Sequence, residues 1–330
     1  MKAIIIANQA SALIAILHLA AGPLRAAEPL VADKPIAVAG AKGGFDFLEV
    51  DPVRRRLLAS HPGNSTLDVF DLDTGKLIKL VPTGKAQDAA VDSEAEKYYV
   101  GVSREQIVAV VDSKTLDKTG EIKIPGPSDA IVFDPKNHCL YVDNDDGTSV
   151  FVIDTKAGKI TATITIPEAP EYAVYDPSSD RIFQNIKLSD ELIVIDPASN
   201  TVKEHWPTAP ALKPHGLALD AASHRLFIAG NNGKLAIMDS TSGKVLVTVD
   251  IASGVDQIAF DGGNKRVYCA GAGGVISVVQ ETADGGTLLA NVKTEATGHT
   301  LTVDPKTHAV WTAFADKTGT TSYIMKLTVP

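Results

Sequence analysis

The sequence is poor in several features that mark particular classes of protein. Only two of its 330 residues are cysteine, which excludes a disulfide-rich scaffold and a Cys-x-x-Cys metal or haem site. Gly-x-Ser-x-Gly motifs and phosphate-cradling glycine loops are also missing, so no local catalytic motif is present. No long run of lysine and arginine stands out, and the net charge is −9. Because affinity for a phosphate backbone comes from clustered basic side chains, we expect no binding to nucleic acid.

Long apolar runs are missing too, with one exception near the N-terminus. Lys2 gives this end a positive charge, and the apolar run 12–21 follows. The run is too short to cross a bilayer, so residues 1–27 are predicted to be a signal peptide and residues 28–330 to form one domain. Pro23 stands where a lipoprotein would have its cysteine, so we expect a periplasmic or secreted protein with no membrane anchor. Without the peptide, 29 basic and 40 acidic residues remain, for a net charge of −11.

What the sequence does have is an internal repeat. Each of seven repeats has an aspartate at the end of its first predicted strand, and successive aspartates are 41 to 44 residues apart. We call these residues the anchor aspartates; they are Asp51, Asp92, Asp134, Asp176, Asp220, Asp261 and Asp304. Four short apolar runs, separated by turn residues such as Pro135 and Gly75, make up most repeats. Four strands at such a period are typical of a β-propeller.

The predicted fold class is therefore all-β, a seven-bladed β-propeller. A four-stranded sheet of this size cannot bury both faces alone, but it can do so between two neighbours in a ring. The last repeat, 300–330, has room for three strands only, and a strand is predicted at 35–39, before the first repeat. We expect this N-terminal strand to complete the last blade, which favours a closed ring over a β-solenoid. The ring also separates Cys139 from Cys269, so we expect two unpaired thiols.

Several short segments carry a family resemblance. They read Leu-Tyr-Val-Asp-Asn at 140–144, Val-Ile-Asp-Thr at 152–155, Pro-Ser-Asp at 127–129 and Pro-His-Gly at 214–216. With them the chain resembles the YVTN-repeat family of seven-bladed β-propellers, which includes YncE-like exported proteins, over nearly all of its mature length. The resemblance implies the fold more than an activity, because such propellers include ligand binders, lactonase-like enzymes and nucleic-acid binders. The Gly-His and Trp-Asp pattern of WD40 repeats is missing.

Alignment of the repeats selects one position as a candidate site. Loops from the fourth strand to the next first strand, and from the second strand to the third, surround one mouth of the channel. The residue five positions before each anchor lies there and is polar in every repeat: Asp46, Gln87, Asp129, Glu171, His215, Asp256 and His299. Because a closed ring directs equivalent positions toward its axis, we expect these side chains to converge. His61 maps to the same mouth, whereas His138, His224 and His308 occupy a turn position that other repeats fill with other polar residues.

The residue types at this mouth allow three functions. His215, Asp256 and His299 come from consecutive blades and are predicted ligands of a divalent metal ion, with Glu171 or His61 as an acid or base. A binding scaffold for a small molecule, a metal or a segment of a protein partner is the leading hypothesis, and the protein is expected to be a monomer. A metal-dependent, lactonase-like hydrolase or lyase is the alternative, and nucleic-acid binding is a third that the charge disfavours. A polar channel that holds only water also fits the pattern.

Overall fold

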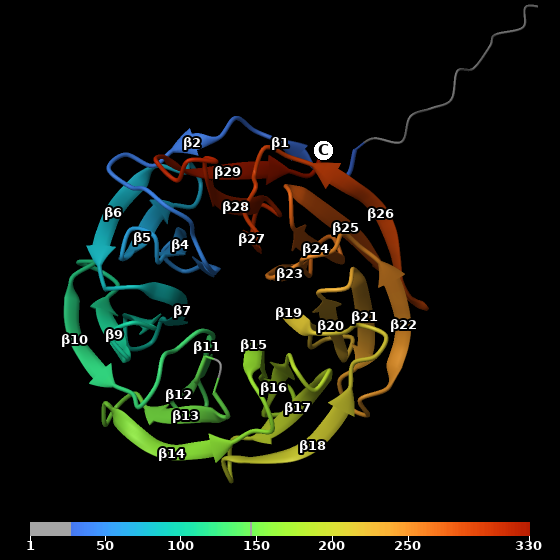
Figure 1. The fold of residues 1–330 in the computed structure, drawn as a ribbon, viewed down its shortest axis with the longest axis horizontal. Coiled ribbons are helices and arrows are strands. Elements are labelled where there is room, and N and C mark those ends of the chain that lie inside the picture. Colours follow the sequence, from blue (N-terminus) through green and yellow to red (C-terminus); the bar gives the residue numbers. More distant parts are fainter. Residues whose placement is uncertain (1–27, 146) are drawn as a thin grey trace, which may run out of the picture.

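Seven sheets form a ring around a central axis in the computed structural model (Figure 1), which describes residues 28–145 and 147–330. The predicted signal peptide lies outside these residues. Every regular element of the described chain is a β-strand. The described residues also contain no helix with the length and apolar character of a membrane span. The prediction of an all-β, seven-bladed propeller is confirmed.

The first six blades each have four antiparallel strands, ordered from the channel outward. Blade one consists of β3 (Leu48–Asp51), β4 (Arg56–His61), β5 (Thr66–Asp71) and β6 (Leu77–Pro82). Blade two consists of β7 (Ala86–Asp92), β8 (Lys97–Val102), β9 (Ile107–Asp112) and β10 (Lys118–Lys123). Blade three consists of β11 (Ile131–Asp134), β12 (Cys139–Asp143), β13 (Ser149–Asp154) and β14 (Lys159–Thr165).

Blades four to six repeat this arrangement on the other side of the ring. Blade four consists of β15 (Pro170–Asp176), β16 (Arg181–Ile186), β17 (Glu191–Asp196) and β18 (Thr201–Pro207). Blade five consists of β19 (Pro214–Asp220), β20 (Arg225–Gly230), β21 (Lys234–Asp239) and β22 (Val245–Asp250). Blade six consists of β23 (Ile258–Asp261), β24 (Arg266–Gly271), β25 (Val275–Thr282) and β26 (Gly285–Lys293).

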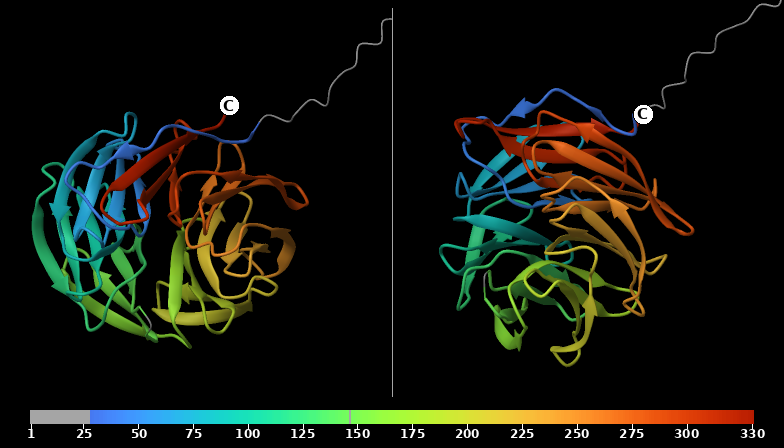
Figure 2. Two further views of the ribbon diagram at one scale, coloured as in Figure 1. Left: turned by 45° about the horizontal axis from the view of Figure 1, so that its top comes forward. Right: turned by 45° about the vertical axis from the view of Figure 1, so that its right-hand side comes forward.

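The last blade joins the two ends of the described chain. It contains β27 (Thr300–Val303), β28 (Val310–Ala315) and β29 (Ser322–Thr328), and its outer edge pairs with β1 (Val31–Ala32) and β2 (Ile36–Ala37). Figure 2 shows the blue N-terminal segment running along the red β29. The strand predicted at 35–39 therefore closes the ring, as expected. The sequence did not show that this outer strand is broken in two, with β1 as a separate piece.

The core consists of seven apolar clusters, one at each interface between neighbouring blades. At the closing interface, Trp311 of the last blade packs with Leu57 and Phe70 of blade one and is 1% exposed. The middle strands of each blade are buried on both faces, which explains their continuous apolar runs. Outermost strands such as β14 alternate buried and exposed residues instead. Cys139 and Cys269 are free thiols, as predicted.

The anchor aspartates fix the turn that follows the first strand of every repeat. All seven are at most 5% exposed. Each carboxylate accepts a hydrogen bond from a backbone N–H of that turn, as Asp51 does from Val53 at 3.0 Å. Side chains of neighbouring blades add to this network: the Tyr98 hydroxyl donates to Asp51 at 2.7 Å, and Arg55 donates to both oxygens of Asp304 at 2.5 and 2.6 Å. We call this side of the ring the anchor end.

Candidate functional site

The opposite side of the ring is the mouth, where the seven aligned polar residues meet. Gln87 lies 3.5 Å from Asp129, measured between Nε2 and Oδ1. The charges of Asp129 and Asp256 act on Asp46, and those of Glu171 and Asp256 act on Asp129. Ion pairs join the remaining members, His215 with Glu171 and His299 with Asp256. The structure thus brings together all seven side chains that the repeat alignment selected.

Three of these side chains form a group with the geometry of metal ligands. One donor atom each from Glu171, His215 and Asp256 lies within 4.8 Å of the other two. The three residues come from blades four, five and six, so the closed ring makes neighbours of positions about forty residues apart in sequence. A cavity of about 280 Å³, lined by His215, Asp256 and His299 among others, opens beside them. The ligand set predicted from the sequence had His299 in place of Glu171.

Hydrogen bonds fix the orientation of His215. Its Nδ1 lies 2.8 Å from the carbonyl oxygen of Lys213, which can only accept, so Nδ1 carries the proton. Asn185 donates to the carbonyl of His215 itself at 2.9 Å. In the neutral imidazole the lone pair is then on the other nitrogen, Nε2, which lies 3.7 Å from Oε1 of Glu171. A histidine that binds a metal usually donates the N–H of one ring nitrogen to an acceptor and coordinates the metal through the other nitrogen.

A cationic side chain already lies next to Glu171. The ammonium group of Lys187 forms an ion pair with Oε1 of Glu171. One imidazole and two carboxylates match the donors that Zn²⁺ and Mn²⁺ take, but ligand bonds of about 2.0–2.2 Å require the three atoms to approach one another slightly. A metal ion would share Glu171 with Lys187 or displace it. The donor set fits a divalent ion on these terms.

His299 is not one of these three residues, but it pairs with Asp256. Its Nδ1 lies 2.5 Å from Oδ2 of Asp256, and its side chain is 48% exposed. The hydrogen bond to Asp256 raises the pKa of His299 and outweighs burial. The pair can hold Asp256 in place, or it can present an imidazole that a carboxylate orients, which is the arrangement of a general base.

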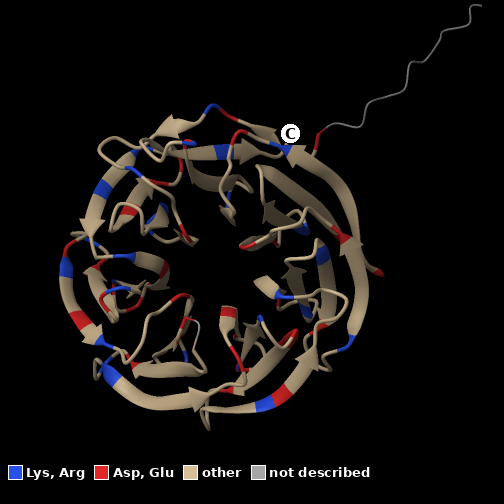
Figure 3. Cartoon of the chain, viewed as in Figure 1, with Lys and Arg blue, Asp and Glu red and all other residues tan. Residues whose placement is uncertain are grey.

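The mouth is electrostatically unfavourable to its own carboxylates. Burial, together with the charge of Glu171, raises the pKa of Asp129 to about 8. Burial and the charges of Asp129 and Asp256 likewise raise the pKa of Asp46 far above its usual range. Acidic residues gather at the inner ends of the blades, while many of the lysines and arginines lie on the outer strands (Figure 3). A bound cation would relieve this repulsion.

The prediction that His61 faces the mouth is wrong. This residue ends β4, and its side chain is fully buried. Nδ1 lies 2.7 Å from Oδ2 of Asp68, and Nε2 lies 3.1 Å from the carbonyl oxygen of Gly43 and 3.2 Å from the hydroxyl of Ser322. The ring also stacks on Phe45, with centroids 3.9 Å apart. The residues before β3 cover His61, which therefore helps to join blades one and seven and cannot act as an acid or base at the mouth.

A second polar layer crosses the channel below the mouth, and the sequence analysis missed it. The Tyr172 hydroxyl donates to Glu49 at 2.8 Å, from blade four to blade one across the ring. The side-chain amide of Gln257 bonds both the N–H and the carbonyl of Leu48, at 3.1 and 2.9 Å. Tyr172 and Gln257 are each the residue after a mouth residue. The neighbouring column of the repeat alignment, which contains Asp88 as well, could have revealed them.

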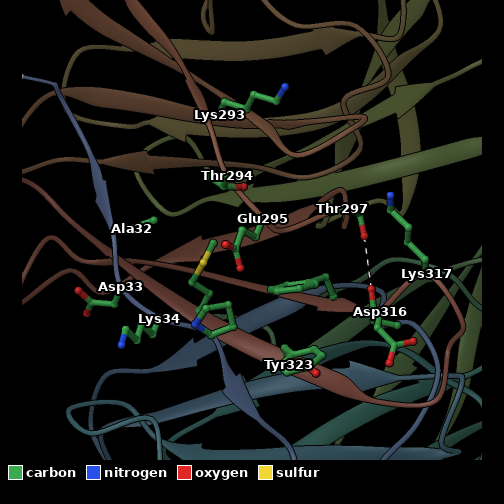
Figure 4. A pocket seen from close by; sticks show the side chains of 14 residues that line it. Ala32, Asp33, Lys34, Lys293, Thr294, Glu295, Thr297, Asp316, Lys317 and Tyr323 are labelled. Carbon is green, nitrogen blue, oxygen red and sulfur yellow. Dashed lines mark hydrogen bonds between the residues drawn. The ribbon is translucent and has the colours of Figure 1, made fainter.

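A larger hollow lies elsewhere, between blades six and seven (Figure 4). It measures about 1,070 Å³ and has a floor of Phe314, Tyr323 and Met325, with the two rings stacked at 5.4 Å. Its lining includes three lysines and three acidic residues, so charge favours no class of ligand there. None of the residues predicted from the sequence contributes to it.

Comparison with known proteins agrees with the fold and goes no further. No family model matches the sequence, and no curated protein does. Among solved structures, hydrazine synthase of Kuenenia stuttgartiensis has a TM-score of 0.74 at 16% identity, covering 89% of this chain and 99% of that one. The RRP9 WD40 repeats have a TM-score of 0.76 at 9% identity, covering 91% and 100%. U3-55K has a TM-score of 0.73 at 10% identity, covering 88% and 98%. At these identities the likeness shows the fold alone: the chain is a β-propeller scaffold, and the YVTN-repeat family stays a prediction.

Proposed function

We propose that the protein is a binding scaffold that holds a divalent cation at the channel mouth through Glu171, His215 and Asp256. The observation that carries this proposal is the approach of the three donor atoms to within 4.8 Å of one another. Three protein ligands leave coordination positions open toward the mouth, where a small molecule with oxygen donors can bind. The positive charge of the cation would attract the oxygen donors of such a molecule, so cation and ligand are expected to bind together.

Metal analysis of the purified protein tests the proposal directly. Titration with Zn²⁺ and Mn²⁺ is expected to show one site, and His215→Ala or Asp256→Asn is expected to weaken it at least tenfold. His205→Ala is the matched control, because His205 is an exposed histidine on the outer strand β18. Equal affinity in the wild type and in both mouth variants would contradict the proposal.

The pH dependence of the same titration adds a second measurement. Burial raises the pKa of Glu171, although His215 and Lys187 oppose the effect. Glu171 must lose its proton before it can coordinate. Metal affinity is therefore expected to rise as the pH is raised from 5 to 8. An affinity that stays constant over this range would mean that Glu171 is not a ligand.

The contact between His299 and Asp256 favours a second candidate, a lactonase-like hydrolase. His299, oriented by Asp256, would take a proton from a water molecule while the water oxygen bonds to the carbonyl carbon of a lactone. The ring C–O bond then breaks, and the proton passes to the leaving oxygen. Because the pKa of His299 is raised, such activity would increase with pH. Lactone hydrolysis that His299→Gln abolishes, with metal binding intact, would separate this enzyme from the scaffold.

Two further parts of the proposal come from the sequence. The apolar run within residues 1–27 supports export to the periplasm or the exterior, and N-terminal sequencing of the mature protein tests it. The net charge of −11 for residues 28–330 argues against nucleic acid as the partner. A mobility shift of DNA that weakens as salt is added would reverse that conclusion.

A further inference from the structure

The anchor end of the channel contains a cavity that belongs to neither the mouth nor the proposed metal site. It measures about 580 Å³ and is bounded by the first strands of blades one to four, β3, β7, β11 and β15, and by the turns after β7 and β11. Among the described residues, its lining includes the acidic residues Glu49, Asp92 and Glu94, and no lysine, arginine or histidine. The walls are otherwise mainly apolar, with Val50, Val91, Val132, Phe133 and Val174 among them. A cavity of this kind favours a ligand that combines a positive charge with a hydrocarbon part.

Asp92 lines this cavity, and among the described residues one of its two carboxylate oxygens has no hydrogen-bond partner. Its Oδ1 accepts the backbone N–H of Ala95 at 2.9 Å. Its Oδ2 has no hydrogen-bond partner among the described residues, although Asp92 is only 2% exposed. A buried carboxylate oxygen without a donor is costly, because the water that solvated it in the unfolded chain has not been replaced.

The other six repeats show what is missing from repeat two. In four of them the residue three positions after the anchor donates to its second oxygen; these residues are Asn137, Ser179, Asn264 and Thr307. In the remaining two, Tyr98 and Lys265 of a neighbouring blade donate, at 2.7 and 2.6 Å. Repeat two has Ala95 at this position, and alanine has no side-chain donor. The unpartnered oxygen is therefore a departure from the protein's own pattern, at the wall of an acidic cavity.

Glu49 supplies a second reason to expect a cation. Burial raises its pKa to about 7, and the hydrogen bond from Tyr172 only partly opposes this effect. Glu49 is consequently half protonated near neutral pH, in a cavity without a basic side chain. A positive charge nearby would favour the ionised form and release the proton.

We propose that this cavity binds a small organic cation, a primary ammonium ion with a short hydrocarbon chain. The ammonium group donates to Oδ2 of Asp92, which satisfies the one anchor carboxylate that the protein leaves incomplete. The hydrocarbon chain lies against the valines, and the aromatic residues Phe133 and Tyr175 also line the cavity. The negative charge of Glu49 adds to the attraction and makes the site selective against neutral molecules of the same shape.

The test compares hexylammonium with 1-hexanol by titration calorimetry at pH 7. Hexylammonium is expected to bind and hexanol to bind at least tenfold more weakly. Glu49→Gln keeps an acceptor for Tyr172 and is expected to weaken the binding of hexylammonium at least tenfold. Ala95→Asn gives Asp92 the donor that Asn137 and Asn264 provide in their repeats, and it is expected to weaken binding about fivefold or more.

Ala157→Asn is the matched control for the second variant. Ala157 stands three residues after Asp154 and donates its backbone N–H to that aspartate at 2.8 Å, just as Ala95 does to Asp92. It does not line the cavity. Binding to the control is expected to equal that of the wild type. Binding in buffers of different ionisation enthalpy is also expected to reveal release of a proton, which the control keeps and Glu49→Gln loses.

Three results would overturn the proposal. Equal binding of hexanol would mean that the cavity is merely apolar, and no binding at all would mean that water satisfies Asp92. Loss of hexylammonium binding in Asp256→Asn, with Glu49→Gln unaffected, would place the amine at the mouth instead. Because that mouth variant is the one that tests the metal site, failure of one proposal can be told from failure of the other.

Discussion

The two ends of the channel use the same residue type in opposite ways. At the anchor end, burial of Asp304 would raise its pKa, but hydrogen bonds from Arg55 and Thr307 prevail and lower the pKa to about 2. At the mouth, burial of Asp129 meets only weak opposition from Gln87, and its pKa is raised to about 8. Both side chains are aspartates at fixed positions of the repeating unit, Asp129 in repeat three and Asp304 in repeat seven. The difference between them is the number of donors that the surrounding chain directs at the carboxylate.

This comparison separates structural acids from those available for binding. An anchor aspartate joins a turn to its own strand and often to the next blade, so its charge stabilises the fold. Asp46 and Asp129 at the mouth have too few donors, so the ionised form of either carboxylate destabilises the fold unless a cation lies nearby. The anchor end of the repeat therefore has carboxylates that, except for Asp92, are fully hydrogen-bonded and stabilise the ring, whereas the mouth has carboxylates with few hydrogen-bond donors.

The largest expected effect is the difference in stability between two single variants, one that removes an aspartate of the anchor end and one that removes an aspartate of the mouth. Asp51→Ala deletes the acceptor of two backbone N–H groups and of the Tyr98 hydroxyl, so the free energy of unfolding should fall by about 3 kcal/mol. Asp46→Ala removes a carboxylate that the mouth already disfavours, so at pH 8 the free energy of unfolding should stay within about 1 kcal/mol of the wild type or rise. Urea unfolding of both variants measures the difference.

Similar losses in the two variants would break the comparison, because Asp46 would then be as structural as Asp51. Circular dichroism of each variant before unfolding confirms that the starting state is the folded propeller. Equal slopes against urea confirm that both variants unfold over the same surface.

The pH dependence of stability is expected to be the next largest effect. A carboxyl whose pKa is raised on folding destabilises the protein fully above its folded pKa and not at all below its unfolded pKa, near 4. Asp129 and Glu49 have folded pKa values of about 8 and about 7. Stability should therefore rise as pH falls from 8 to 5, by on the order of 2 kcal/mol once coupling between the acids is allowed for.

Asp129→Asn should remove a large part of this rise, and Asp284→Asn serves as its control. Asp284 is an exposed acid in the turn between β25 and β26, far from the channel. Unfolding free energies of the three proteins at pH 5, 6.5 and 8 give the result. A wild type that is more stable at pH 8 than at pH 5 would show that the mouth acids are ionised without strain.

The anchor end was more predictable from sequence than the mouth, for a physical reason. An anchor aspartate caps its own turn, so its partners lie two or three residues away and repeat with the period of the chain. The convergence of His215 and Asp256 also followed from the period, because ring closure fixes which positions meet. What the period cannot give is the environment of a single side chain. His61 shares a loop type with mouth residues, but Phe45 and Gly43 cover it from outside the repeat.

The second polar layer is another feature that the period of the repeat does not predict. Glu49 and Tyr172 are three blades apart and occupy different positions of the repeat, so no aligned column contains both. Their pairing depends on the width of the channel, which the sequence does not encode locally. That Glu171 and not His299 forms a group with His215 and Asp256 has a similar origin, since side-chain length and rotamer decide which donor atoms approach one another.

The smallest expected effect concerns the turn at the anchor end itself. The residue four positions after each anchor has a left-handed backbone in all seven repeats, with φ between 52° and 61°, and none of the seven is glycine. His224→Gly removes the strain of a side chain in this conformation, so the free energy of unfolding should change by less than about 1 kcal/mol, in the stabilising direction.

His308 has the same backbone, but its Nδ1 lies 2.8 Å from Oδ1 of Asp261 in the neighbouring blade. His308→Gly should therefore destabilise the protein by about 1 kcal/mol, because the loss of this bond exceeds the relief of strain. Opposite signs for two substitutions at one φ would show that what the anchor end needs at this position is a donor and not a particular backbone; equal signs would show that the turn alone decides.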